Sequence, residues 1–236
     1  MTGKREIRSP KDLARFIDHT LLSMNATTDD IRRLCKEALV EGFYAVCVNP
    51  IHVSTAASFL KGSDVKVVSV IGFPLGQTFT EVKIKEAIMC VEDGAEELDI
   101  VGNLTWILEG KFERFENELK KVIDSAKKIK EDITTKVIIE VPVLSKNQAK
   151  KAALCVANAG ADFVKTATGK GPRGTVVDDV ILLREVLPEN VKIKAAGGIR
   201  TLDQAISLIK AGADRLGTSS AMKIIGEAKE VLEKKC

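Results

Sequence analysis

Short apolar runs, many of them rich in β-branched residues, recur along the chain and alternate with longer amphipathic segments. Near-continuous apolar runs of this length are typical of parallel strands that are covered by helices. The pattern predicts eight strands, which are FIDHT from Phe16, AVCVN from Ala45, VKVVSVIGF from Val65, ELDIVGN from Glu97, KVIIEV from Lys136, DFVKTAT from Asp162, KIKAAGG from Lys192 and DRLGTS from Asp214.

Four of the segments between these strands carry clear helix start and stop signals. They run from Thr28 to Gly42, from Thr80 to Gly94, from Ser145 to Gly160 and from Thr201 to Gly212. A hydroxyl side chain caps the first turn of a helix, and glycine commonly ends the last turn. The order of helix, Gly-Ala-Asp/Glu and strand recurs as GAEELDI, GADFVKT and GADRLGT, which indicates an internal βα repeat.

Strict alternation of eight strands with helices predicts an α/β fold, a closed (β/α)8 TIM barrel, as a single domain over residues 1–236. A barrel of this kind needs roughly 250 residues, so the length leaves no room for a second module. No GxGxxG motif follows the first strand, which disfavours an open dinucleotide-binding sheet. Residues 1–12 precede the first strand, as either an additional short helix or a loose end.

Composition and charge narrow the classes of function. The net charge is +3 and both signs are interspersed, so we expect neither a nucleic-acid partner nor a membrane surface. No apolar run approaches the ~18 residues of a membrane span. The 5 cysteines form no CxxC pair and there are 2 histidines, which predicts reduced thiols, a cytoplasmic protein and no metal site.

Charged residues interrupt the apolar pattern where the predicted strands end. Asp18, Asp99 and Lys165 end their strands, Glu140 lies at the end of the fifth, and Lys194 lies in the seventh. In a TIM barrel the carboxyl ends of the strands carry the active site. A buried charge is costly unless it is paired, so the competing interpretation is a structural ion-pair layer, which stays open for Asp18 and Glu140.

Lys165 and Lys194 lie on neighbouring strands at similar depth, and repulsion between them favours a neutral amine on one. A neutral amine attacks carbonyl carbon and forms a Schiff base, and a nearby carboxylate such as Asp99 moves protons. The combination predicts an imine-forming aldolase.

The last three strands end in glycine-rich segments, FVKTATGKG, AAGGIR and RLGTSS. Loops after the last strands of such barrels often bind phosphate, and glycine lets backbone N–H groups approach an anion. The predicted phosphate site consists of Gly169, Lys170, Gly197, Gly198, Arg200, Gly217, Ser219 and Ser220. The competing interpretation is that these glycines only form tight turns.

Motifs along nearly the whole chain resemble the class I deoxyribose-phosphate aldolases, in family order and at family spacing. They are IDHTLL, AVCVNP, VIGFPLG, ELDIVGN, VIIEV, FVKTATGKG, KAAGGIR and RLGTSSA. The resemblance implies reversible cleavage of 2-deoxy-D-ribose 5-phosphate to D-glyceraldehyde 3-phosphate and acetaldehyde. It implies no cofactor and no metal, and a homo-oligomer that is a dimer or a tetramer.

The resemblance also implies a role for individual residues. Lys165 forms the imine with the sugar's C1, Lys194 perturbs Lys165 and relays protons, and Asp99 donates and accepts protons. The glycine-rich segments hold the phosphate. Family positions that line the pocket match Asp18, Thr20, Cys47 and Asn103.

Two departures from the family pattern stand out. Glu140 is followed by Val141 and Pro142 where many relatives have threonine, and the chain ends in EKKC without the tyrosine that some relatives carry. Three rival functions remain: a Schiff-base aldolase for a longer sugar phosphate, a non-catalytic sensor of a phosphorylated ligand, and a structural or interaction protein.

Overall fold

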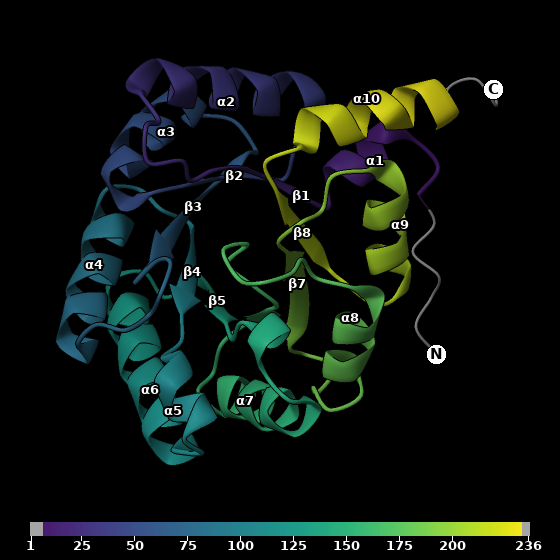
Figure 1. The fold of residues 1–236 in the computed structure, drawn as a ribbon. Helices are drawn as coiled ribbons and strands as arrows, with labels where there is room; N and C mark the ends of the chain where they lie inside the picture. The colour runs from purple at the N-terminus through teal and green to yellow at the C-terminus, as the bar shows by residue number, and fades with distance from the viewer. Residues whose placement is uncertain (1–6, 233–236) are drawn as a thin grey trace.

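The computed structural model describes residues 7–232, and its eight strands form one closed parallel barrel in chain order (Figure 1). The final strand pairs with the first, which closes the sheet. The predicted fold class and all eight predicted strands are confirmed. The strands are β1 (Ile17–Leu21), β2 (Ala45–Val48), β3 (Lys66–Ile71), β4 (Glu97–Val101), β5 (Thr134–Ile138), β6 (Phe163–Lys165), β7 (Lys192–Ala196) and β8 (Arg215–Thr218).

Helices surround the barrel on the outside, as Figure 1 shows. They are α1 (Pro10–Ala14), α2 (Thr28–Glu41), α3 (Val53–Leu60), α4 (Thr80–Glu92), α5 (Leu104–Leu108), α6 (Phe112–Ile129), α7 (Lys146–Asn158), α8 (Val177–Arg184), α9 (Leu202–Lys210) and α10 (Ala221–Leu232), with the short 3-10 helices η1 (Pro50–His52) and η2 (Val141–Val143). The segment 1–12, for which a helix or a loose end was expected, contains the start of α1, and its residues 1–6 lie outside the described part of the chain.

Two of the four predicted helix starts need correction. Ser145 and Thr201 cap α7 and α9 as expected. The cap of α2 is Thr27 rather than Thr28, because Thr27 and Asp30 form a reciprocal capping box. Thr80 lies in the first turn of α4, and its hydroxyl donates to the carboxylate of Glu118 instead of capping the helix.

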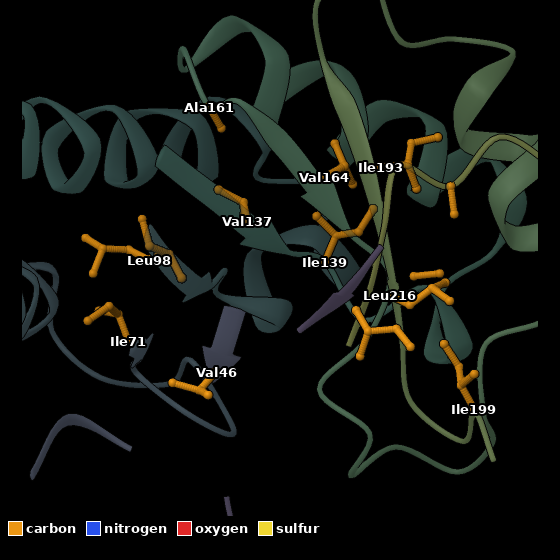
Figure 2. Close-up of a cluster of buried hydrophobic side chains, with 14 of the residues drawn as sticks. Val46, Ile71, Leu98, Val137, Ile139, Ala161, Val164, Ile193, Ile199 and Leu216 are labelled. Atoms are coloured by element: carbon orange, nitrogen blue, oxygen red, sulfur yellow. The ribbon is translucent and has the colours of Figure 1, made fainter. Parts of the chain in front are cut away.

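Side chains alternate between the two faces of each strand, so every second residue points away from the barrel axis. The outward residues pack with helix residues in one buried cluster, and Figure 2 shows part of it, including Val46, Leu98, Val137, Val164 and Leu216. The inward positions of β2 and β3 form a small apolar cluster of their own. The inward positions of the other strands carry most of the buried charges, which explains why each charge has apolar neighbours in the sequence.

Between residues 7 and 232, none of the helices combines the length and the apolar character that crossing a membrane requires.

Candidate active site

Seven charged side chains lie in the barrel interior, and each is at most 5% exposed. Their ion pairs connect them into one network across six strands. The members are Asp18, Glu97, Asp99, Lys136, Lys165, Lys194 and Arg215.

The depth of two of these residues differs from the sequence-based expectation. Asp18 is the second residue of β1 and Asp99 is the central residue of β4, whereas both were expected to end their strands. Strand pairing continues beyond them, from Leu21 to Val48 and from Val101 to Ile138, and this extends both strands. Lys165 is the last residue of β6, as predicted.

Asp99 lies at the centre of the network. Its Oδ2 accepts hydrogen bonds from the Nζ atoms of Lys165 and Lys194, both at 2.7 Å. Its Oδ1 accepts from Lys136 at 3.0 Å. Lys194 also pairs with Asp18, whose Oδ1 accepts from Arg215 at 2.9 Å. The two lysines that the sequence placed side by side are register partners, and one carboxylate oxygen joins them.

Charge pairing overcomes burial at these groups. Burial would raise the pKa of Asp99, but Lys136, Lys165 and Lys194 hold it well below its ordinary value. Burial likewise opposes ionisation of Asp18, yet Lys194 and Arg215 lower its pKa to about 2. The pKa of Lys194 is raised, because Asp18 and Asp99 outweigh the effect of burial. The two carboxylates therefore favour the charged form of Lys194. The expectation of a neutral amine on one of the two lysines stays a prediction.

A pocket of about 290 Å³ opens at the carboxyl ends of the strands, above this network. Of the network residues, only Lys165 lines it. The pocket wall also contains Thr168 and, of the residues singled out from the sequence, Thr20, Gly169, Lys170, Gly197, Gly198, Arg200, Gly217, Ser219 and Ser220. The predicted phosphate-binding residues thus all meet at one site, next to the amine of Lys165.

The glycine-rich loops approach each other more closely than side chains would allow. Gly197 has φ 95°, and a Cβ atom there would lie 3.2 Å from the Cα of Gly169. A Cβ atom at Gly174 would lie 3.0 Å from the carbonyl oxygen of Gly197. Ser219 and Ser220 immediately precede α10, so the positive end of that helix lies beside the pocket. Together these features favour an anionic ligand group.

Three residues predicted to line the pocket lie elsewhere. Asp18 and Cys47 are fully buried and are absent from the pocket wall. Burial raises the pKa of the Cys47 thiol to about 11, so it stays protonated at neutral pH, with its Sγ 4.0 Å from Oδ2 of Asp99. Asn103 precedes α5, is 8% exposed and does not line the pocket.

Glu140 contacts the loop between β6 and α8, and neither Glu140 nor Val141 lines the pocket. Glu140 comes after the end of β5, and its Oε2 accepts from the backbone N–H of Thr168 at 2.9 Å. Val141 is buried and is not part of the pocket wall. The chain end EKKC belongs to residues outside the described part of the structure.

Sequence reasoning missed Glu97, Lys136 and Arg215, which complete the network. The signal was present in the strand period, since Glu97 and Asp99 are two residues apart and therefore share the inward face. Arg215 stands two residues before Gly217 on the same face of β8. Applying the two-residue period to every strand would have found all three.

Comparisons with known proteins agree with this geometry. Residues 13–226 match the family model described as DeoC/LacD family aldolase. A curated deoxyribose-phosphate aldolase from Aciduliprofundum boonei is 49% identical over 215 residues, which are 91% of this chain and 96% of the relative. One from Caldicellulosiruptor saccharolyticus is 48% identical over 217 residues, 92% of this chain and 98% of the relative.

Among solved structures, the chain is similar to one titled "Unique tetrameric structure of deoxyribose phosphate aldolase from Aeropyrum pernix". The two are 38% identical and superpose with a TM-score of 0.89, covering 95% of this chain and 94% of the other. The family model spans nearly the whole barrel, from α1 to α10. The chain belongs to the DeoC/LacD family of aldolases.

Proposed function

We propose that this chain is a deoxyribose-phosphate aldolase, which reversibly cleaves 2-deoxy-D-ribose 5-phosphate to D-glyceraldehyde 3-phosphate and acetaldehyde through a Schiff base on Lys165. The observation that carries the proposal is the position of the Lys165 amine. It lines a pocket walled by glycine-rich loops while it shares Oδ2 of Asp99 with Lys194.

The charge balance of the buried network favours Lys165 as the nucleophile. The network holds four cationic side chains and three carboxylates, so the loss of one proton balances it. Lys194 and Lys136 each contact two carboxylates, and Lys165 is paired with Asp99 alone among the network carboxylates. Lys165 is therefore the lysine that the fewest carboxylates hold, and in its neutral form an amine attacks an aldehyde.

The proposed reaction begins when the amine of Lys165 attacks C1 of the open-chain sugar and loses water, which forms a protonated imine. The imine withdraws electrons from C2, so removal of the C3 hydroxyl proton breaks the C2–C3 bond. A water takes that proton and relays it to Asp99 through Lys194, which gives a proton to Asp99 as it receives one. A proton returns to C2 of the enamine by the same route. Hydrolysis then releases acetaldehyde and the free amine.

The phosphate end of the sugar is proposed to bind the glycine-rich loops and the start of α10. Lys170 and Arg200 add positive charge on the same wall. Binding energy from this remote group aligns C1 with Lys165 and so contributes to the rate. A sensor of a phosphorylated ligand would use the same loops but has no need of three lysines around Asp99.

Two further properties belong to the same proposal. We propose a cytoplasmic enzyme, since the four cysteines between residues 7 and 232 are buried free thiols. We also propose a homo-oligomer, a dimer or a tetramer. Exposed apolar side chains on and before α4, among them Leu75, Phe79, Val82 and Met89, support this, as does the tetrameric relative.

Borohydride trapping tests the proposed function. Wild-type protein reduced in the presence of deoxyribose 5-phosphate is expected to gain the mass of a reduced imine, which peptide mapping places on Lys165. Lys165→Leu is expected to gain none. Lys170→Leu is the matched control, because Lys170 is the other lysine of the pocket wall, and it should retain the adduct.

A folded wild-type protein that binds the sugar phosphate and gains no adduct contradicts the aldolase proposal and favours the sensor. An adduct that forms only with a longer sugar phosphate favours the rival aldolase.

A further inference from the structure

Glu140 occupies an irregular step between β5 and η2. The N–H of Ile139 donates to the carbonyl of Lys165 at 3.2 Å, and the N–H of Val141 donates to the carbonyl of Thr166 at 2.8 Å. The two donating N–H groups are therefore two residues apart in the chain, whereas the two accepting carbonyls are one residue apart. In a regular parallel ladder, donors and acceptors both recur every two residues. Glu140 is the extra residue, with φ 54° and ψ 55°. Among residues 7–232 it is the one non-glycine residue with positive φ.

The carboxylate of Glu140 contacts the β6–α8 loop on both sides of Gly169 and Lys170. Oε2 accepts from the N–H of Thr168 at 2.9 Å, and Oγ1 of Thr168 accepts from the N–H of Lys170 at 3.1 Å. On the other side, a Cβ atom at Gly171 would lie 2.8 Å from Oε1 of Glu140. Gly169 and Lys170, which line the pocket, are therefore bracketed by contacts to one side chain.

The later part of the same loop is held by other partners. Thr175 donates through its N–H to the carbonyl of Gly197 at 2.9 Å, and through its hydroxyl to the carbonyl of Ala196. Arg173 makes two hydrogen bonds to Asp179, at 2.7 and 2.9 Å. These contacts hold residues 173–175 and leave the position of 168–171 to depend on Glu140 and on the packing of Gly169 against Gly197.

We infer that Glu140 is a positioning residue, which holds the segment 168–171 in the conformation that binds the phosphate of the substrate. The inference rests on the proposed function. Glu140 does not line the pocket, so it acts through the backbone of Thr168. Because the imine forms at the other end of the sugar, loss of the Glu140 carboxylate should weaken phosphate binding and leave the chemistry at Lys165 intact.

Three substitutions separate this role from a general effect on stability. Glu140→Gly removes the carboxylate and suits the left-handed backbone, because glycine adopts positive φ without strain. Glu140→Gln keeps an oxygen that accepts from Thr168. Gly171→Ala introduces a Cβ atom whose three nearest neighbours all belong to Glu140, so it displaces that carboxylate selectively.

With deoxyribose 5-phosphate, Glu140→Gly is expected to raise KM about tenfold, the loss of one hydrogen bond to a charged group. Its kcat should stay within about twofold of wild type. KM for unphosphorylated 2-deoxyribose should not change, and Glu140→Gln should resemble wild type with both sugars. Gly171→Ala alone should raise KM for the phosphorylated sugar, and should add nothing in the Glu140→Gly background.

If Glu140→Gly impaired the reactions of both sugars equally, Glu140 would have a structural role alone, and the inference would be overturned. Additive effects on KM in the double variant would also overturn it. If wild-type protein cleaves neither sugar, the proposed function fails by itself. The same five proteins titrated with inorganic phosphate by calorimetry then decide the inference, since Glu140→Gly must weaken phosphate binding for it to stand.

Discussion

At the scale of single residues, the buried charges of the barrel depend on one another. Lys194 lies between Asp18 and Asp99, and all three side chains are fully buried. A buried ion pair adds little stability compared with apolar packing, but removing one partner leaves an uncompensated charge. The network thus keeps two carboxylates and an ammonium ionised in a place where each alone would be neutral.

Lys194→Met tests this dependence, since methionine fills similar space without the charge. We expect a loss of about 3–5 kcal/mol in the free energy of unfolding, because Asp18 and Asp99 lose their shared partner. We also expect kcat to fall by about 10²–10⁴-fold, as proton transfer is impaired. Lys192→Met, on the exposed start of the same strand, is the control and should change stability by less than about 0.5 kcal/mol. Urea unfolding and steady-state kinetics measure both, and a Lys194→Met protein as stable as wild type would contradict the prediction.

At the scale of elements, a second buried ion pair joins the helices outside the barrel. Nζ of Lys83 on α4 lies 2.8 Å from Oε2 of Glu118 on α6, and it also donates to the carbonyl of Val101 at the end of β4. Burial lowers the pKa of Lys83 and raises the pKa of Glu118, against the attraction between them. The pair therefore connects two helices to the strand that carries Asp99.

Removing one member of this pair should cost more than removing both. Lys83→Met or Glu118→Leu alone is expected to destabilise the fold by about 3–5 kcal/mol, and the double variant by clearly less, because it leaves no unpaired charge. The exposed pair Lys120 and Asp124 on α6 is the control, where Lys120→Ala should cost at most about 1 kcal/mol. Urea midpoints of wild type, the two single variants and the double variant measure the coupling between Lys83 and Glu118. Strictly additive losses of stability would contradict the prediction.

At the scale of the whole molecule, the barrel interior sets the response of the fold to pH. The pKa of Asp18 in the folded state is about 2, and that of Asp99 is also well below its ordinary value. An aspartate in an unfolded chain has a pKa of about 3.9. The unfolded state therefore binds protons first as pH falls, so the stability from these groups is present above about pH 4 and is lost toward pH 2.

Urea midpoints measured from about pH 6 to pH 2 should consequently fall most steeply below about pH 4. Asp18→Asn, which has no carboxyl proton to bind, should begin less stable and lose stability less steeply over the same interval. Parallel curves for the two proteins would show that Asp18 does not contribute to acid unfolding.

The sequence by itself determined the barrel and the end of it that carries the site. Near-continuous apolar runs specify strands, capped amphipathic segments specify helices, and their strict alternation favours a closed parallel sheet. The alternation of side chains along each strand determines which charges point inward, and the glycine-rich ends of the last three strands mark the pocket wall. These signals are local, because each lies within one short segment of the sequence.

The tertiary structure alone decided how the inward charges meet. Lys136, Lys165 and Lys194 reach Asp99 across 37, 66 and 95 residues of sequence, and Arg215 reaches Asp18 across 197. Such contacts depend on strand register and barrel closure, which no local sequence pattern specifies. For the same reason the left-handed backbone of Glu140 was not predictable, because it results from a mismatch between the ladders of β5 and β6. The residues available for catalysis follow from the sequence, and their protonation states follow from the packing of the closed barrel.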